Sequence, residues 1–105
     1  GEENTIAIPG FEKVTLYANE TTQAVNFHNP EINDCYFKIS LIHPDGSVLW
    51  ISDLIEPGKG MYSIELEKTL AVGEYENAVL KYECFSLNDQ SPLNGSEINL
   101  KLVVV

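Results

Sequence analysis

Apolar and polar side chains alternate along most of this chain with a period of two residues. Within residues 35–42 the odd positions are apolar, namely Cys35, Phe37, Ile39 and Leu41. This spacing is typical of a half-buried β-strand, because successive side chains of a strand point to opposite faces. No segment has the 3.6-residue period of an amphipathic helix, so the pattern predicts an all-β protein.

Turn residues divide this pattern into seven or eight short strands. We expect strands at residues 5–8, 11–18, 22–28, 35–42, 47–52, 61–67, 75–87 and 96–105. Residues 35–52 form a hairpin, because Pro-Asp-Gly at positions 44–46 presets φ at proline and allows positive φ at glycine. Short strands joined by such turns predict one domain over residues 1–105, an antiparallel two-sheet β-sandwich.

The expected strand at residues 75–87 contains a break in its alternation. Its apolar positions, beginning with Ala78, share one face, and the same parity would place Glu76 inside and Tyr75 outside. A β-bulge adds one residue to a strand and reverses the alternation. We therefore predict a bulge at Glu76 and Asn77.

Composition narrows the classes of function. The 105 residues carry 16 Asp and Glu against 6 Lys, which gives a net charge of −10, and there is no arginine. Such a surface disfavours nucleic acid, because few cations are present to neutralise phosphates. No apolar run approaches the roughly 20 residues that span a bilayer, so we expect no direct membrane insertion by this segment. The acidic surface is expected to keep the protein monomeric.

The sequence contains no recognisable catalytic motif. There is no Gly-x-Ser-x-Gly elbow, no glycine-rich phosphate loop and no histidine pair at metal-binding spacing. We therefore predict a protein that is not an enzyme and has no cofactor.

Calcium is a weaker hypothesis for the loops. Residues 29–34, 53–60 and 88–95 are expected to gather at one end of the sandwich. They carry Asp34, Asp53 and Asp89. Oxygen ligands from separate loops can bind Ca²⁺, although aspartate is also an ordinary turn residue.

The stretch from Leu70 to Tyr75, Leu-Ala-Val-Gly-Glu-Tyr, resembles the tyrosine corner of immunoglobulin-like and fibronectin type III-like sandwiches. The resemblance implies that the Tyr75 hydroxyl bonds to the backbone near Ala71, that Leu70 fills the core and that Gly73 allows a tight turn. A buried tyrosine needs a partner for its hydroxyl, which favours this structural role over acid–base catalysis.

A second resemblance covers residues 11–105. Four stretches carry it, at residues 35–41, 53–58, 70–75 and 82–87. They are similar to small uncharacterised sandwich modules of exported or membrane-anchored proteins from Gram-positive gut bacteria. The resemblance implies an extracellular or membrane-anchored location with the anchor upstream, and residues 1–4 are expected to be a tag remnant or linker.

The immunoglobulin-like architecture implies that Cys35 and Cys84 lie on neighbouring antiparallel strands, at the start of one and near the end of the other. Both cysteines have inward parity. Export would favour a disulfide between them, whereas a reducing compartment would favour two buried thiols that behave as small hydrophobes.

An aromatic surface patch is the second candidate for binding. Tyr36 and Phe85 point outward on the same two strands and are expected to be cross-strand neighbours, with Val79, Ile42 and Met61 extending the patch. An exposed apolar patch often marks a partner surface. The alternative is that a loop or the N-terminal segment covers it.

These features support a non-catalytic extracellular or cell-surface module for protein–protein interaction or adhesion, with an unknown protein or glycan as ligand. The second hypothesis is a carbohydrate-binding or protease-inhibitor-like module that uses the loops at residues 29–34, 53–60 and 88–95. The third is a pilus-like subunit whose last strand, residues 98–105, completes a neighbouring copy.

Overall fold

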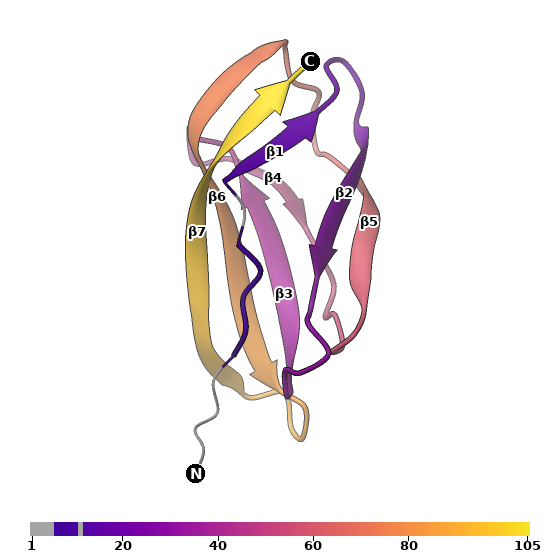
Figure 1. Cartoon of the computed structure of the whole chain (residues 1–105), viewed down its shortest axis with the longest axis vertical. Helices are drawn as coiled ribbons and strands as arrows, with labels where there is room; N and C mark the ends of the chain where they lie inside the picture. The colour runs from indigo at the N-terminus through magenta and orange to yellow at the C-terminus, as the bar shows by residue number, and fades with distance from the viewer. Residues whose placement is uncertain (1–5, 11) are drawn as a thin grey trace.

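The computed structural model describes residues 6–10 and 12–105. Over this part of the chain it is all-β, without a helix, and Figure 1 shows two sheets facing each other in a sandwich-like arrangement. The strands are β1 (Lys13–Leu16), β2 (Thr22–His28), β3 (Cys35–Ile42), β4 (Val48–Ile51), β5 (Gly60–Glu65), β6 (Gly73–Ser86) and β7 (Pro92–Val104).

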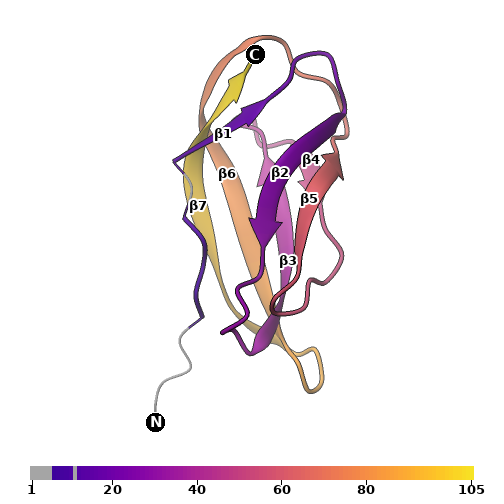
Figure 2. The same ribbon diagram turned by 45° about the vertical axis from the view of Figure 1, so that its right-hand side comes forward.

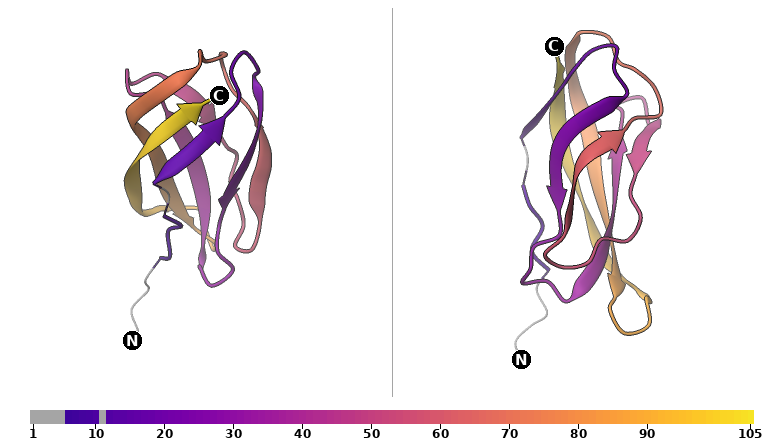
Figure 3. Two further views of the ribbon diagram at one scale, coloured as in Figure 1. Left: turned by 45° about the horizontal axis from the view of Figure 1, so that its top comes forward. Right: turned by 90° about the vertical axis from the view of Figure 1, so that its right-hand side faces the viewer.

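The larger sheet has the strand order β1-β7-β6-β3-β4, and the smaller sheet pairs β2 with β5. All pairings are antiparallel except that of β1 with β7, which is parallel. The larger sheet curls around the smaller one, so that β1 at its edge lies beside β2 (Figures 2 and 3). The core fills the space between the two sheets.

The core follows the predicted alternation. The odd positions of β3 from Cys35 to Leu41 are buried, and so are Ala78, Leu80 and Tyr82 on β6. Burial of a large aliphatic or aromatic side chain is worth about 1.5–3 kcal/mol, which makes this shared face the main source of stability. The sequence correctly predicted which side of these two strands faces inward.

The predicted bulge in β6 is confirmed. Tyr75 pairs with Leu102 and Ala78 pairs with Leu100, so β6 has one residue more than β7 over this interval. Asn77 takes the left-handed conformation, with a φ of 67°. The extra residue lets the side chains of Tyr75 and Ala78 both point to the inner face of the sheet, toward the core.

The first expected strand is wrong over the described residues. Residues 6–8 are irregular, and residue 5 lies outside the described residues. The backbone of Ala7 bonds to the side chain of Asn33 instead of to a strand: its N–H donates to Oδ1 at 2.7 Å, and its carbonyl accepts from Nδ2 at 2.9 Å. The second strand was predicted at residues 11–18, but β1 covers only Lys13–Leu16, and residue 11 is not described.

Two other expectations are wrong. The loop predicted at residues 88–95 is shorter, because β7 already begins at Pro92. On β5, Met61 is expected in the outward-facing aromatic patch, whereas it packs against the core and its neighbour Tyr62 is 58% exposed. The cause is a register shift in β2 between Ala24 and Phe27, which places Met61 opposite the buried Phe27.

Candidate interaction surface

The stretch from Leu70 to Tyr75 forms the predicted corner contact at the upper end of the molecule in Figure 1. The Tyr75 hydroxyl donates a hydrogen bond of 2.7 Å to the Ala71 carbonyl. Leu70 is buried, and its carbonyl accepts a bond of 3.1 Å from the Asn19 backbone. Gly73 is the first residue of β6. The contacts of this stretch are therefore internal, and they fix the start of β6.

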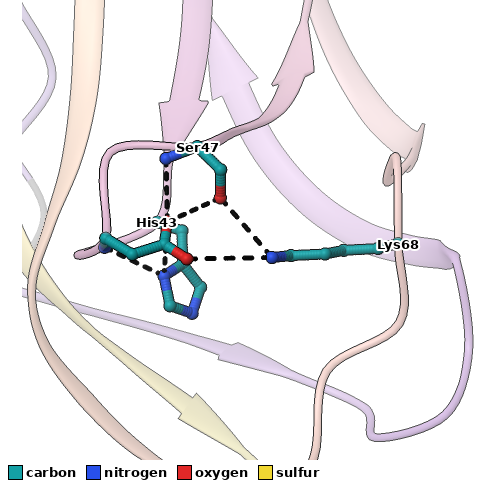
Figure 4. Close-up of polar contacts among 4 residues, drawn as sticks. His43, Ser47 and Lys68 are labelled. Carbon is teal, nitrogen blue, oxygen red and sulfur yellow. Dashed lines mark hydrogen bonds and ion pairs between the residues drawn. The ribbon is translucent and has the colours of Figure 1, made fainter.

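A polar cluster beside this corner is a turn rather than a catalytic triad (Figure 4). The Ser47 hydroxyl donates its one proton to Asp45 Oδ1 at 2.6 Å, and its oxygen accepts from Lys68 Nζ at 3.5 Å. The imidazole Nδ1 of His43 accepts from the Asp45 backbone N–H at 3.0 Å. The serine proton is thus committed to the aspartate and is not held by the histidine, as a triad requires.

The cluster is built by the β3–β4 hairpin. His43 N–H donates to the Ser47 carbonyl and Gly46 N–H donates to the His43 carbonyl, both at 2.8 Å, and Gly46 has φ of 93°. This is a type I turn closed by a residue of positive φ. The side-chain and backbone hydrogen bonds from Ser47 hold the pKa of the exposed Asp45 carboxyl at about 2.

The two cysteines lie where the sequence placed them, with β3 and β6 as antiparallel neighbours. Cys84 pairs with Phe37 and Cys35 pairs with Ser86, so the cysteines are diagonal neighbours on the buried face. They are free thiols that hydrogen-bond to each other, and no disulfide joins them. Burial raises the pKa of Cys84 to about 12 and raises that of Cys35, so both thiols stay protonated at neutral pH.

The loops at the opposite end are held together by two buried asparagine side chains. Asn29 Nδ2 donates to the carbonyls of Cys35 at 2.8 Å and Ile55 at 2.9 Å, and Asn33 Nδ2 donates to Asn29 Oδ1 at 2.9 Å. The backbone of Asn29 also bonds to Lys59 and Gly58. Loops 29–34 and 53–60 therefore meet as predicted, but these amides satisfy buried backbone groups and are not presented to a ligand.

The structure does not support the calcium hypothesis. Within residues 6–10 and 12–105 there is no group of three or more His, Cys, Asp or Glu side chains that could hold a metal ion. The three candidates Asp34, Asp53 and Asp89 are therefore not brought into one such site. Asp89 instead accepts the Ser91 backbone N–H at 3.0 Å, which closes the turn between β6 and β7 and lowers the pKa of its carboxyl.

The outer face of the larger sheet, the face turned away from the smaller sheet, carries the aromatic patch. Tyr36 on β3 pairs directly with Phe85 on β6, and Phe85 pairs directly with Pro92 on β7. Tyr36 and Phe85 are half-buried, and Pro92 is exposed. The expected cross-strand neighbours Tyr36 and Phe85 thus form, with Pro92, a row of three ring side chains across three strands, which we call the aromatic row after its two aromatic members.

The predicted extension of this patch is only partly correct. Ile42 and Val79 pair with each other on the same outer face, but two pairs of polar residues separate them from the aromatic row. These are Lys38 with Glu83 and Ser40 with Lys81. Met61 lies on the other sheet and packs against the core, so it does not belong to the patch.

A shallow pocket of about 500 Å³ adjoins the aromatic row between β6 and β7. Its lining includes Lys81, Glu83, Phe85, Pro92, Gly95 and Glu97. The pocket combines an apolar base with charges of both signs, which suits a ligand that has apolar and polar parts.

Sequence reasoning missed Pro92 and Gly95, since proline and Asn-Gly are ordinary loop signals. Here they mark an irregular strand. β7 carries one extra residue between Leu93 and Ser96, and a Cβ on Gly95 would lie 2.3 Å from the Tyr82 carbonyl oxygen. The glycine itself was the available signal, because a glycine inside a strand often marks a bulge or a close approach of two backbones.

Comparison of the chain with protein-family models, with curated proteins and with solved structures gave no match. In the described part of the chain there is no helix long and apolar enough to cross a membrane.

Proposed function

We propose that this chain is a non-catalytic, immunoglobulin-like module that binds another protein through the outer face of its larger sheet. The strand order β1-β7-β6-β3-β4 against β2-β5 and the bond from Tyr75 to Ala71 support the immunoglobulin-like assignment. Fold alone does not define function, so the proposal depends on the surface chemistry.

The aromatic row of Tyr36, Phe85 and Pro92 is the observation that carries this proposal. Partly exposed aromatic side chains are enriched at protein interfaces, because each buries a large apolar area with few rotatable bonds. The row lies on strands rather than on loops, so its geometry is fixed before a partner arrives. Lys81 and Glu83 beside it supply polar groups for a rim around an apolar centre.

An extracellular or cell-surface location is part of the proposal. It is supported by the resemblance to exported modules and by the diagonal placement of Cys35 and Cys84 on neighbouring strands, a pair of thiols that an oxidising compartment would favour as a disulfide. Intact-mass measurement after alkylation of unfolded, unreduced protein from an oxidising expression host tests this part. Two labelled cysteines would remove the disulfide from the argument.

The binding proposal is tested with wild type and two matched variants on a panel of extracellular proteins and a glycan array. Phe85→Ser removes the centre of the aromatic row, and Tyr62→Ser removes an exposed tyrosine from the other sheet. We expect a protein ligand that is lost with Phe85→Ser and retained with Tyr62→Ser. Equal binding by all three proteins would refute the role of the outer face.

A carbohydrate-binding module is the second candidate, because aromatic side chains beside charged groups also suit a sugar ring. A Phe85-dependent signal on the glycan array alone would favour it. The loops are weaker as a glycan or protease site, since Asn29, Asn33 and Asp89 are already engaged internally. We do not propose assembly through residues 98–105, because residues 102–104 of β7 pair on both sides within the chain.

A further inference from the structure

The strand β7 has one open edge beside the aromatic row. We propose that residues 96–100 of this edge bind an extended, basic segment of another protein as an added β-strand. This inference rests on the proposed function, and it names the class of partner and the way it is held. We call residues 92–99 the lower half of β7 and residues 101–104 its upper half.

Hydrogen-bond parity shows which backbone groups face the open edge. Lys101 N–H donates to the Glu12 carbonyl at 3.1 Å, and Val105 N–H donates to the Leu16 carbonyl at 2.9 Å. Odd-numbered residues at this end of β7 therefore direct their backbone groups away from β6. Continued downward with a period of two, the same parity directs the groups of Glu97 and Asn99 outward.

No strand pairs with this lower edge in the described residues, because β1 pairs only with residues 101–104. The segment at residues 6–8 passes beside the lower half of β7 (Figure 2), but Ala7 donates and accepts with Asn33 instead. Residues 92–97 are all exposed, and for Gly95 the exposed atoms are backbone. Unpaired N–H and C=O groups on an exposed edge are a template for another strand.

A shallow pocket lies on each side of this edge. The pocket by the aromatic row lies between β6 and β7, and a second one of about 290 Å³ is lined by Ile6, Ile8 and residues 94–96. Gly95 and Ser96 belong to both linings. Side chains of an added strand alternate between its two faces, so successive residues of the partner would meet one pocket and then the other.

The negative charge of this chain favours a basic partner segment. Glu83 and Glu97 line the first pocket with one lysine, Lys81, which is the cross-strand neighbour of Glu97. Within the described residues neither carboxylate makes an ion pair, and the charged groups of the lining sum to a net negative charge. The chain carries a net charge of −10, which attracts a basic segment and repels a second copy. Antiparallel pairing of this edge with itself would also bring Glu97 close to its own copy. The bulge at Gly95 limits the paired stretch to residues 96–100.

The experiment is an NMR titration of ¹⁵N-labelled protein with the peptide acetyl-Lys-Val-Lys-Val-Lys-Val-Lys-amide. One control peptide replaces lysine with glutamate. Another keeps all the side chains but is N-methylated at residues 2–7, so that neither edge of the extended peptide can donate the hydrogen bonds of a strand. We expect the Glu97 and Asn99 amides to shift with the basic peptide, and binding about tenfold or more weaker for both controls.

Two variants test the edge itself. Asn99→Pro removes an outward N–H and leaves the bonds to β6 in place, which a strand edge tolerates. Asn99→Ala removes the same side chain but keeps the N–H. We expect peptide binding to be lost with Asn99→Pro and retained with Asn99→Ala, while the amide signals of the core confirm that both variants are folded.

The outcomes separate this inference from the proposed function. Peptide binding that survives Asn99→Pro, or millimolar peptide without shifts at Glu97 and Asn99, overturns the added strand. In either case the Phe85→Ser comparison on the protein panel still decides whether the outer face binds a partner. Conversely, edge binding that is unaffected by Phe85→Ser supports the inference even if the aromatic row proves inert.

Discussion

The two halves of β7 differ in what surrounds them. Residues 101–104 pair with β1 on one side and residues 102–104 pair with β6 on the other, and Leu102 and Val104 are buried between the sheets. Among the described residues, residues 92–99 pair with no strand other than β6, and most of their side chains are exposed. One strand thus completes the core at its end and leaves a free edge at its beginning.

The sequence explains this difference. The upper half reads Lys-Leu-Val-Val, whose β-branched and leucine side chains suit a paired, half-buried strand. The lower half contains Pro92, Asn94, Gly95 and Glu97, which add little buried area and interrupt regular pairing. Stability therefore depends mainly on the upper half, and the lower half contributes an edge that can bind a partner.

The largest expected effect comes from core truncation in the two halves. Leu102→Ala should destabilise the protein by about 2–5 kcal/mol, because it leaves a cavity at a fully buried site. Ile98→Ala should cost less than half as much, since Ile98 is only partly buried. Urea unfolding followed by circular dichroism measures both. Equal losses would mean that the lower half is as important to the core as the upper half.

The segment beside the lower half provides the next test. Asn33→Ala removes both bonds to Ala7 and one to Asn29, and it should cost about 1–3 kcal/mol because buried polar groups lose their partners. The Ala7 amide should also exchange its hydrogen faster. Asn94→Ala, at an exposed position nearby, should change stability by no more than about 0.5 kcal/mol. An unchanged Ala7 exchange rate in Asn33→Ala would show that the segment is held by other contacts.

Much of the upper and central sheet could be predicted from the sequence, because one periodic signal dominates there. Strict alternation identified the buried face of β3, and its failure at Tyr75 identified the bulge at Asn77. The neighbouring positions of Tyr36 and Phe85 followed from the same parity. These features are local consequences of a period of two.

The remainder depended on contacts between distant segments. Asn29 and Asn33 have the composition of a loop but lie inside, because their amides bond to carbonyls that the chain brings together only on folding. Pro92 and Gly95 read as a loop because single-residue signals do not reveal a bulged strand. Met61 turned inward because of a register shift on the partner strand, which alternation within β5 cannot show.

A smaller effect is expected at Tyr82, which pairs with Ser96 at the top of the irregular stretch of β7. Its hydroxyl is buried and has no hydrogen-bond partner among the described residues, and burial raises its pKa. Tyr82→Phe should therefore raise stability by about 1 kcal/mol, because an unsatisfied polar group is removed. Tyr75→Phe is the matched control and should lower it by about 1 kcal/mol, since that hydroxyl bonds to Ala71. A loss of stability in Tyr82→Phe would mean that its hydroxyl finds a partner.

The smallest expected effect compares charges on the outer face of the two halves. In the upper half, Lys101 Nζ lies 3.1 Å from Glu74 and 3.6 Å from Glu76, and hydrogen bonding to Glu74 raises the lysine pKa from its usual value of 10.5. Because the pKa of Lys101 is higher in the folded state, the protonated lysine stabilises the folded protein at every pH below its unfolded-state pKa of about 10.5. This contribution is lost as the pH rises above about 10.5 and the folded-state lysine loses its proton. Lys101→Gln should thus lower the urea midpoint slightly at pH 7, less so in high salt, and not at all above the lysine pKa. Glu97→Gln in the lower half should lower the urea midpoint less than Lys101→Gln does, because its cross-strand neighbour Lys81 lies beyond ion-pair distance among the described residues and the protein is already strongly acidic. A loss with Glu97→Gln equal to that with Lys101→Gln would show that the carboxylate is engaged within the chain, and it would remove the charge argument for a basic partner at this edge.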